Sequence, residues 1–329
     1  MEDIILKVSD LKTYLYTDEG TVPAVDGVSF ELREKETLGV VGESGCGKSM
    51  LALSILRLIP VPPAKIVAGE VLFKGSNLID KKESEMRKIR GNEISMIFQE
   101  PMTSLNPVHT VGNQISEVIR LHQGLSKKEA KEKSVQMLEL VKISNPHHTI
   151  NDYPHQLSGG MRQRVMIAMA LACNPKVLIA DEPTTALDVT IQAGILKLIR
   201  ELKNKLGTSV ILITHDLGVV AQVAKHVMVM YAGRVVEYAD AKALFNYPKH
   251  PYSVGLLNSI PLLQKSVMEL YTIKGTVPSV RDMPSGCKFS PRCNKRMEIC
   301  STKEPDLYCT PENSLVRCWL YKGDKPNEE

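Results

Sequence analysis

The sequence predicts an α/β fold, in which buried parallel strands alternate with helices, and three observations support this prediction. First, four short apolar runs are bounded by glycine or charged residues, as is typical of strands buried on both faces: 37–41, 177–180, 209–214 and 227–230. Second, helix-like stretches lie between them: 49–58, 161–173 and 190–206. Third, a glycine-rich segment joins the first run to the first helix. This alternation predicts a mostly parallel sheet with helices on both faces.

Composition places the chain among ordinary globular proteins. Of its 329 residues, 43% are hydrophobic and 24% are charged, which excludes collagen-like and disordered classes. A net charge of +4 is too small to indicate a nucleic-acid or anionic-membrane partner. The longest apolar run has nine residues (165–173), well short of the roughly 20 needed to cross a bilayer. With no signal-peptide pattern at the start, we expect a cytosolic chain whose seven cysteines are thiols or metal ligands.

Three further regions complete the predicted organisation. Residues 5–35 and 66–75 carry short alternating runs, which predict a small antiparallel sheet beside the core. A helical subdomain is expected at about 99–160, where Ser126 and Glu129 form a capping-box pattern. After residue 246 prolines recur, and five of the seven cysteines lie between 287 and 318. We therefore predict a main domain at 1–246 and a short cysteine-rich extension at 247–329.

The glycine-rich segment Gly42–Ser49 (GESGCGKS) fits the phosphate-binding pattern G-x-x-x-x-G-K-[ST] between a strand and a helix. Its glycines allow the backbone to curl, so that consecutive N–H groups face a phosphate near a helix start. Lys48 would then reach the β- and γ-phosphates, and the Ser49 hydroxyl would bind Mg²⁺. The alternative is a glycine-rich turn with an exposed lysine. The remaining residues predicted to contact the nucleotide are Gly42, Ser44, Gly45, Cys46 and Gly47.

Two acids follow the apolar run at 177–180, at the edge of the sheet where ligands bind in α/β folds. Asp181 can hold Mg²⁺, and Glu182 is placed to orient or deprotonate an attacking water molecule. The alternative is a pair of solvent-exposed acids at the end of a strand. Their position downstream of a phosphate loop favours a hydrolytic site.

A second glycine motif, Leu157-Ser158-Gly159-Gly160, precedes the helix near residue 161. A serine and two small residues at a helix start are typical of an anion site, although a simple helix cap has the same pattern. One nucleotide does not need two phosphate cradles from one chain. We therefore expect a nucleotide site shared between two subunits.

Together with Gln99, residues 186–188 and His215, these motifs resemble the nucleotide-binding subunit of an ABC transporter over about residues 5–245. The resemblance implies an ABC-type P-loop NTPase core and two subunits that enclose two ATP molecules between them. It implies that Gln99 senses Mg²⁺ and the membrane subunits. It also implies that His215 contacts the γ-phosphate, although a lone histidine after a strand is often merely packed or solvated.

Three positions depart from the usual pattern of this family or leave it ambiguous. Cys46 replaces a smaller loop residue, which matters little because only backbone contacts are needed there. Met161 replaces a glutamine that is common after the second glycine motif. The aromatic residue expected to stack on adenine is Tyr14 or Tyr16, and we favour Tyr16.

Longer segments are similar to ATPase subunits of dipeptide and oligopeptide importers; they lie at 96–107, 157–175, 181–190 and 250–261. The resemblance implies two multi-span permease subunits, a second and paralogous ATPase, and indirectly an external solute-binding protein. It places the chain on the cytoplasmic face of the membrane, with no nucleic-acid partner. Nickel importers share these features, so the solute stays open. A soluble ABC ATPase that acts on nucleic acid or ribosomes is the alternative from a different class.

The extension carries Cys287, Cys293 and Cys300 at C-x5-C-x6-C spacing, followed by Cys309 and Cys318. Four thiolates suit a [4Fe–4S] cluster or a structural Zn²⁺ ion. Zinc sites usually contain closer cysteine pairs, which favours the cluster. Cys318 is the preferred fourth ligand because the family pattern has a cysteine before a hydrophobic residue. Unliganded thiols or disulfides are the remaining alternative.

Overall fold

A computed structural model describes residues 3–99, 104–185, 187–259, 272–278 and 282–323. The chain forms two compact units that alternate along the sequence. The first unit contains residues 1–6, 32–37 and 73–213, and the second contains residues 7–31, 38–72 and 214–329. Within the described residues, every helix is too short or too polar to cross a membrane.

The first unit contains three parallel strands, β6 (Ile94–Ile97), β7 (Val177–Asp181) and β8 (Ser209–Ile213), with β7 in the middle. All residues of β7 and β8 are buried, because a strand covered on both faces must be apolar along its whole length. The 18-residue helix α8 (Val189–Leu206) connects β7 to β8. A helix between two parallel neighbours is the usual crossover of an α/β sheet.

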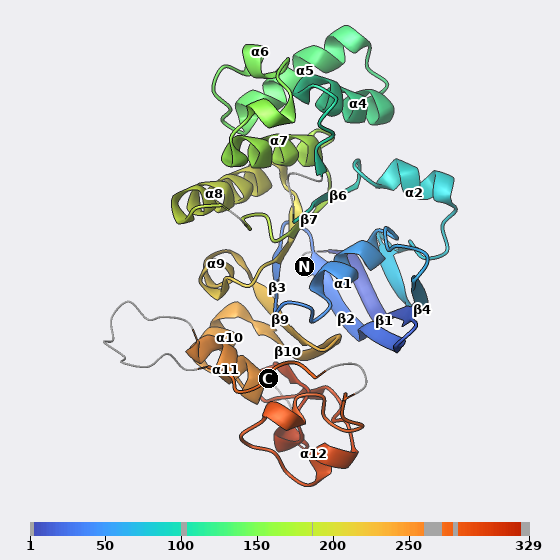
Figure 1. Cartoon of the computed structure of the whole chain (residues 1–329), viewed down its shortest axis with the longest axis vertical. Coiled ribbons are helices and arrows are strands. Elements are labelled where there is room, and N and C mark those ends of the chain that lie inside the picture. The colour runs from blue at the N-terminus through green and yellow to red at the C-terminus, as the bar shows by residue number, and fades with distance from the viewer. Residues whose placement is uncertain (1–2, 100–103, 186, 260–271, 279–281, 324–329) are drawn as a thin grey trace. The chain divides into compact units, whose positions relative to one another are not determined.

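A group of helices fills the sequence between β6 and β7 and lies together in Figure 1, coloured green. The predicted capping box is confirmed: the Ser126 N–H donates to Glu129 (2.9 Å), and the Glu129 N–H donates to the Ser126 hydroxyl (3.4 Å). The helices pack through buried aliphatic side chains such as Ile115, Ile119 and Leu138. Their bounds are α4 (Val111–Gln123), α5 (Lys127–Leu140), α6 (Pro146–Thr149), η1 (Pro154–Gln156) and α7 (Gly159–Leu171). The first unit also contains β5 (Ser76–Asn77) and α2 (Glu83–Ile89).

In the second unit, β3 (Thr37–Val41) runs parallel to β9 (His226–Tyr231). Strand β9 pairs antiparallel with β10 (Arg234–Asp240). Helix α9 (Leu217–Val223) crosses close to β3, because a Cβ atom at Gly39 would lie 2.5 Å from the Val220 side chain. Helices α1 (Lys48–Ile55) and α10 (Ala241–Asn246) follow β3 and β10.

The predicted small sheet is also present. Strands β1 (Ile4–Thr17) and β2 (Gly20–Arg33) are neighbours joined by two residues, so they run antiparallel. Strand β4 (Ala64–Phe73) lies on the other side of β1. Figure 1 draws these three strands in blue.

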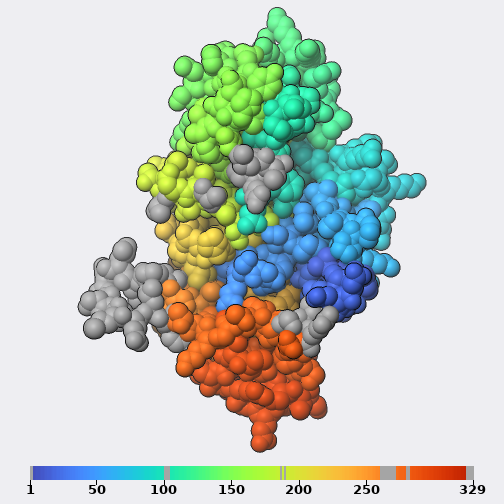
Figure 2. All heavy atoms as spheres, in the orientation of Figure 1, coloured from blue at the N-terminus to red at the C-terminus, as the bar shows by residue number. Residues whose placement is uncertain are grey.

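The extension packs on β9 and β10 through an aromatic cluster. Tyr231 of β9 makes edge-on contacts with Tyr252 and Phe289 at centroid distances of 4.9 and 5.2 Å. All three side chains are buried, and Figure 2 shows the orange and red atoms of the extension as one packed surface. Its elements are α11 (Pro251–Asn258), η2 (Ser290–Arg292), α12 (Ile299–Thr302), β11 (Tyr308–Cys309), β12 (Leu315–Val316) and η3 (Trp319–Tyr321). Strand β12 pairs antiparallel with both β10 and β11.

The predicted α/β class, helical region and small sheet are confirmed. Each of the four predicted core strands exists with ends shifted by one residue at most. Strands β6 and β10 were not predicted, because β6 has only four residues and β10 contains Arg234, Glu237 and Asp240. The domain limits at 246/247 stay a prediction.

Candidate nucleotide-binding site

The phosphate loop lies in the second unit and has the backbone that the motif requires. Gly42, Gly45 and Gly47 have φ angles of 152°, 77° and 102°, which side-chain-bearing residues rarely adopt. A Cβ atom at Gly42 would lie 2.3 Å from the Met230 carbonyl oxygen, and one at Gly47 would lie 2.1 Å from the Ala24 carbonyl oxygen. The glycines therefore provide both the curl of the loop and its close contact with neighbouring backbone.

Lys48 begins helix α1 and its side chain is folded back over the loop. Its ammonium donates to the carbonyl oxygens of Gly42 (2.9 Å) and Glu43 (3.1 Å), and the residue is only 5% exposed. A buried ammonium held by the carbonyls of a phosphate loop can exchange them for phosphate oxygens. This arrangement prepares the loop for an anion.

The other loop residues differ in exposure. Ser44 and Gly45 are exposed at the tip of the loop, and Ser49 is half-buried in the first turn of α1. Cys46 is fully buried, and burial raises the pKa of its thiol. The thiol therefore stays protonated, and Cys46 takes part in the loop through its backbone, as the sequence analysis expects.

In the first unit, β7 delivers the two acids to its carboxyl end. Asp181 is the last residue of the strand and is buried, whereas Glu182 is half-buried and has a φ angle of 44°. This left-handed backbone is unfavourable for glutamate, and it is held by a hydrogen bond from the Glu182 N–H to the Ile213 carbonyl (2.9 Å). The two consecutive acids therefore differ in burial, with Asp181 inside the strand end and Glu182 in the turn that follows.

The Glu182 carboxylate has two side-chain donors. The Gln99 amide donates to it at 3.3 Å, and the Thr185 hydroxyl donates at 2.9 Å. The structure thus brings together two of the predicted residues, Gln99 and Glu182, from separate segments of the first unit. The sequence analysis missed Thr185, although a threonine three residues after an acid is a recognisable signal of a local side-chain hydrogen bond.

The second glycine motif forms the start of helix α7. Ser158 is the N-cap residue, and its hydroxyl accepts from the Met161 N–H at 3.3 Å. Ser158 and Gly159 are exposed, whereas Gly160 is buried. A Cβ atom at Gly160 would lie 3.0 Å from the Ile191 side chain, which is a tight contact. The motif therefore acts as a helix cap, and its role as an anion site stays a prediction.

The two aromatic candidates in the second unit are clearly different. The Tyr14 hydroxyl donates to Asp26 at 3.0 Å, which fixes this ring within the protein. Tyr16 is 51% exposed, which leaves its ring accessible for stacking. His215 is also exposed and follows Thr214, whose N–H donates to the Val40 carbonyl.

Four cysteines of the extension lie near one another: Cys287, Cys293, Cys300 and Cys318. Burial raises the pKa of the Cys287 thiol to about 11, and the neighbouring thiols of Cys293, Cys300 and Cys318 raise it further. The Cys287 N–H donates to the Cys300 carbonyl at 2.9 Å, and all seven cysteines are free thiols. Within the described part of the chain, no group of three or more His, Cys, Asp or Glu side chains could hold a metal ion. The described residues therefore contain no ready coordination shell, and the predicted [4Fe–4S] or Zn²⁺ site stays a prediction.

A few positions of the recognised motifs lie outside the described residues. They are residues 100–103 after Gln99, Ala186 in the segment 186–188, and residues 260–261 at the end of the segment 250–261. Asp188, which follows Ala186, caps helix α8 by accepting from the Ile191 N–H at 2.9 Å.

Comparison with known proteins identifies the class that this fold and these motifs define. Residues 25–185 match the ABC transporter family, and residues 236–300 match the oligopeptide/dipeptide transporter C-terminal region. A solved dimer of the ATP-binding cassette MJ0796 with ADP and Pi aligns with a TM-score of 0.64 and 28% identity. It covers 72% of this chain, and the alignment covers 98% of that cassette. The chain is therefore an ATPase of the ABC transporter family.

Proteins with similar sequences show to which group of ABC ATP-binding subunits the chain belongs. A probable peptide ABC transporter ATP-binding protein (y4tR) of Sinorhizobium fredii is 54% identical over 96% of this chain and 95% of its own length. The oligopeptide transport ATP-binding protein AppD of Bacillus subtilis is 52% identical over 97% of this chain and 98% of its own length. The dipeptide transport ATP-binding protein DppD of the same organism is 52% identical over 96% and 94%. The chain belongs to the peptide-transporter group of ABC ATP-binding subunits.

Proposed function

We propose that this chain is one of two ATPase subunits in an importer of dipeptides or oligopeptides, bound to the cytoplasmic face of the membrane. The observation that carries this proposal is the identity of about half of all residues, over nearly the full length, with subunits named for peptide transport. The C-terminal match at 236–300 supports it independently, because that region is itself named for oligopeptide and dipeptide transporters.

The proposed site roles follow from the residues of each unit. Lys48 and the loop N–H groups bind the triphosphate, and Tyr16 stacks on adenine. Glu182 orients and deprotonates the attacking water, and Gln99 holds the carboxylate of Glu182 in place until nucleotide arrives. His215 contacts the γ-phosphate from its exposed position.

The donor set for Mg²⁺ fits that ion. Ser49, Gln99 and Asp181 offer a hydroxyl, an amide and a carboxylate oxygen, which are the hard ligands that magnesium prefers. When bound, the ion would neutralise charge on the β- and γ-phosphates.

The exposed start of α7 supports a site shared with a second ATPase subunit. Ser158, Gly159 and Gly160 would contact the triphosphate held by the partner's loop, since an exposed helix start favours anions. Met161 in place of glutamine favours a paralogous partner over a second identical copy. Two multi-span permease subunits would carry the solute, supplied by an external solute-binding protein.

Two experiments test this function. Glu182→Gln should lower MgATP hydrolysis by about 10³-fold while nucleotide binding persists, because the general base is lost and the binding groups remain. Unchanged turnover in that variant would contradict the assigned base. In cells that depend on this subunit, uptake of labelled tripeptide should disappear with Glu182→Gln, whereas uptake of nickel ions should not; the reverse result would contradict the peptide assignment.

We also propose that Cys287, Cys293, Cys300 and Cys318 bind a [4Fe–4S] cluster, with Zn²⁺ as the alternative. The support is the C-x5-C-x6-C spacing together with the proximity of the four thiols, since Cys293, Cys300 and Cys318 each raise the pKa of the Cys287 thiol. Anaerobically purified protein should contain about four iron atoms per chain and absorb near 400 nm, as the cluster type dictates. Protein that contained neither iron nor zinc would contradict this assignment.

A further inference from the structure

The C-terminal extension contacts the phosphate loop directly, at a residue that the phosphate-binding pattern leaves unspecified. Glu43, the second residue of the loop, receives two hydrogen bonds from the guanidinium of Arg292 at 2.8 and 3.0 Å. Arg292 lies in η2, 249 positions later in the sequence and next to Cys293. Two parallel N–H···O bonds between a guanidinium and a carboxylate form the most directional ion pair available to proteins.

The Arg292 side chain is built into the extension before it reaches the loop. Only 5% of it is exposed, its Nε donates to the Lys274 carbonyl (3.1 Å), and its guanidinium lies 5.8 Å from the ring centre of Tyr231. Burial alone would lower the pKa of Arg292, but the Glu43 carboxylate and the Tyr231 hydroxyl raise it overall. The guanidinium therefore remains charged. Its contacts with Lys274 and Tyr231 help to orient it independently of the loop.

Glu43 connects this arginine to the phosphate-binding lysine. Its carboxylate accepts from Arg292, its N–H donates to the Tyr252 hydroxyl (2.9 Å), and its carbonyl accepts from the Lys48 ammonium (3.1 Å). The side chain and the N–H thus contact the extension, while the carbonyl contacts Lys48. A shift of Glu43 would therefore move a carbonyl that determines where the ammonium of Lys48 lies.

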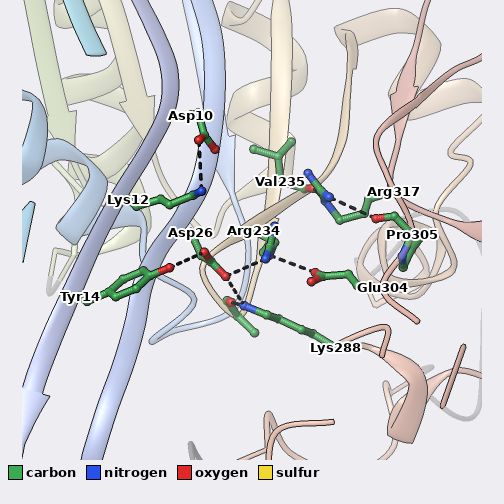
Figure 3. A network of polar contacts seen from close by, with 11 residues as sticks. Asp10, Lys12, Tyr14, Asp26, Arg234, Val235, Lys288, Glu304, Pro305 and Arg317 are labelled. Carbon is green, nitrogen blue, oxygen red and sulfur yellow. Dashed lines mark hydrogen bonds and ion pairs between the residues drawn. The ribbon is translucent and has the colours of Figure 1, made fainter. Parts of the chain in front are cut away.

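A second chain of contacts starts from the same short segment of the extension. Lys288 donates to the Ala232 carbonyl (3.0 Å) and to Asp26 (3.1 Å), and Figure 3 shows this lysine approaching Asp26 beside Arg234. The next residue of that turn, Gly233, donates its N–H to the Cys46 carbonyl at 3.0 Å. Residues 288–292 therefore fix the loop at its beginning, through Glu43, and near its end, through Cys46.

The cavity beside this network is too small for a further ligand. It is lined by residues that include Arg234, Lys288, Glu304 and Arg317, and its accessible space of about 10 Å³ would hold a single water molecule. The charged groups drawn in Figure 3 already have protein partners: Arg234 bonds Asp26 (2.9 Å) and Glu304 (3.0 Å), and Arg317 donates to the Val235 and Pro305 carbonyls. The network therefore has a role in holding protein segments together.

We propose that Arg292 is a positioning residue for ATP binding, which holds the phosphate loop in its anion-ready shape through Glu43. The proposal rests on the ATPase function and deepens it by assigning to the extension a part in nucleotide affinity. The effect of Arg292 passes through Glu43 to the loop backbone and to Lys48.

The test is equilibrium binding of Mg-ATPγS to the full-length chain by calorimetry, at a temperature well below unfolding of every variant. R292Q and E43Q should each weaken binding about tenfold, because the loop loses a preorganising contact. The double variant R292Q/E43Q should be no weaker than either single variant, since both remove the same ion pair. The matched control is R296Q, because Arg296 lies in the same extension, is exposed and donates to the nearby Ser301 hydroxyl.

The outcomes separate this inference from the ATPase function. Normal binding by wild-type protein and by R292Q would overturn the positioning role and leave the ATPase intact. Effects of R292Q and E43Q that multiply in the double variant would also overturn it, because the residues would then act independently. Should R292Q fail to fold, E43Q tests the same bond with the extension unaltered, and a wild-type affinity in E43Q would overturn the proposal. In hydrolysis assays, R292Q should raise the KM for ATP and leave kcat within about twofold, a separation that general instability would not produce.

Discussion

The phosphate loop and the C-terminal extension are built in opposite ways. The loop is eight consecutive residues whose glycines and lysine define its shape, whereas the extension depends on contacts with residues far away in the sequence. Lys288 bonds Asp26 across 262 positions, and Arg292 bonds Glu43 across 249. A local motif therefore specifies which ligand is bound, whereas ion pairs with distant residues determine how rigidly that motif is positioned.

The largest expected effect is a loss of nucleotide affinity when the lysine of the phosphate loop is removed. Lys48→Ala should weaken Mg-ATPγS binding by more than about 100-fold, because the triphosphate loses its buried ammonium partner. Calorimetric titration measures this change. Lys303→Ala is the matched control, since Lys303 is exposed in the extension and should leave binding unchanged. If both variants bound nucleotide equally well, the local motif would not be the source of affinity.

The second effect concerns the aromatic contact that holds the extension on β9. Phe289 is 4% exposed and packs against Tyr231 and Tyr252, so Phe289→Ala should lower the free energy of unfolding by about 3–5 kcal/mol. Urea denaturation measures the loss, and limited proteolysis should cleave the extension first. The comparison variant Ile299→Ala removes a partly exposed side chain of the same region and should cost less than about 1 kcal/mol. Equal losses would show that Phe289 is not a special anchor.

A smaller effect should appear as a pH dependence of stability. Burial lowers the pKa of His250 to about 3, from 6.5 when it is solvated. Between these values the unfolded chain binds a proton that the folded chain rejects, so stability falls as pH drops below 6.5, by about 1.4 kcal/mol per pH unit. Between pH 6.5 and 5 the imidazole should therefore cost about 2 kcal/mol.

The variant His250→Asn isolates this contribution. Asparagine can still accept from the Tyr252 N–H, which bonds the His250 Nδ1 at 3.0 Å, but it does not titrate. Burial raises the pKa of Glu237 above its ordinary value of 4.5, so this acid favours the folded state as the pH falls toward 4.5. Glu237 is present in both proteins, so the comparison between them cancels its contribution. Urea unfolding at both pH values should show a smaller acid loss in the variant. An identical loss in both proteins would exclude His250 as its cause.

The smallest effect tests the backbone contact between the two regions. Tyr252→Phe removes the hydroxyl that accepts from the Glu43 N–H, which should cost about 1 kcal/mol of stability and weaken Mg-ATPγS binding about two- to fivefold. Tyr321→Phe is the control, because its hydroxyl donates to the Lys249 carbonyl, away from the loop. The prediction would be wrong if Tyr321→Phe weakened Mg-ATPγS binding and Tyr252→Phe did not.

The sequence predicted those parts of the molecule that depend on neighbours along the chain. The loop glycines, the acids after β7 and the cap at Ser126 all follow from local spacing and backbone geometry. Strand β10 was not predicted because it lacks the continuous apolar run of the other core strands. Its polar residues are typical of an antiparallel strand, and β10 pairs antiparallel with β12. The Arg292–Glu43 pair was also not predicted, since a single sequence gives no signal that joins two charges 249 residues apart. The family resemblance implied a role for Gln99 at the nucleotide site, and its hydrogen bond to Glu182 is what the structure adds.

The pairing of β12 with β10 has a consequence for any shortened form of this protein. Val316 and Leu315 lie opposite Glu237 and Tyr238, so two residues near the end of the extension cover part of the outer rim of the sheet. A fragment that stopped near residue 246 would expose the backbone N–H and C=O groups of β10 to any other chain with an open strand. Such fragments should aggregate, and strand β12 therefore protects this edge of the sheet from unwanted pairing.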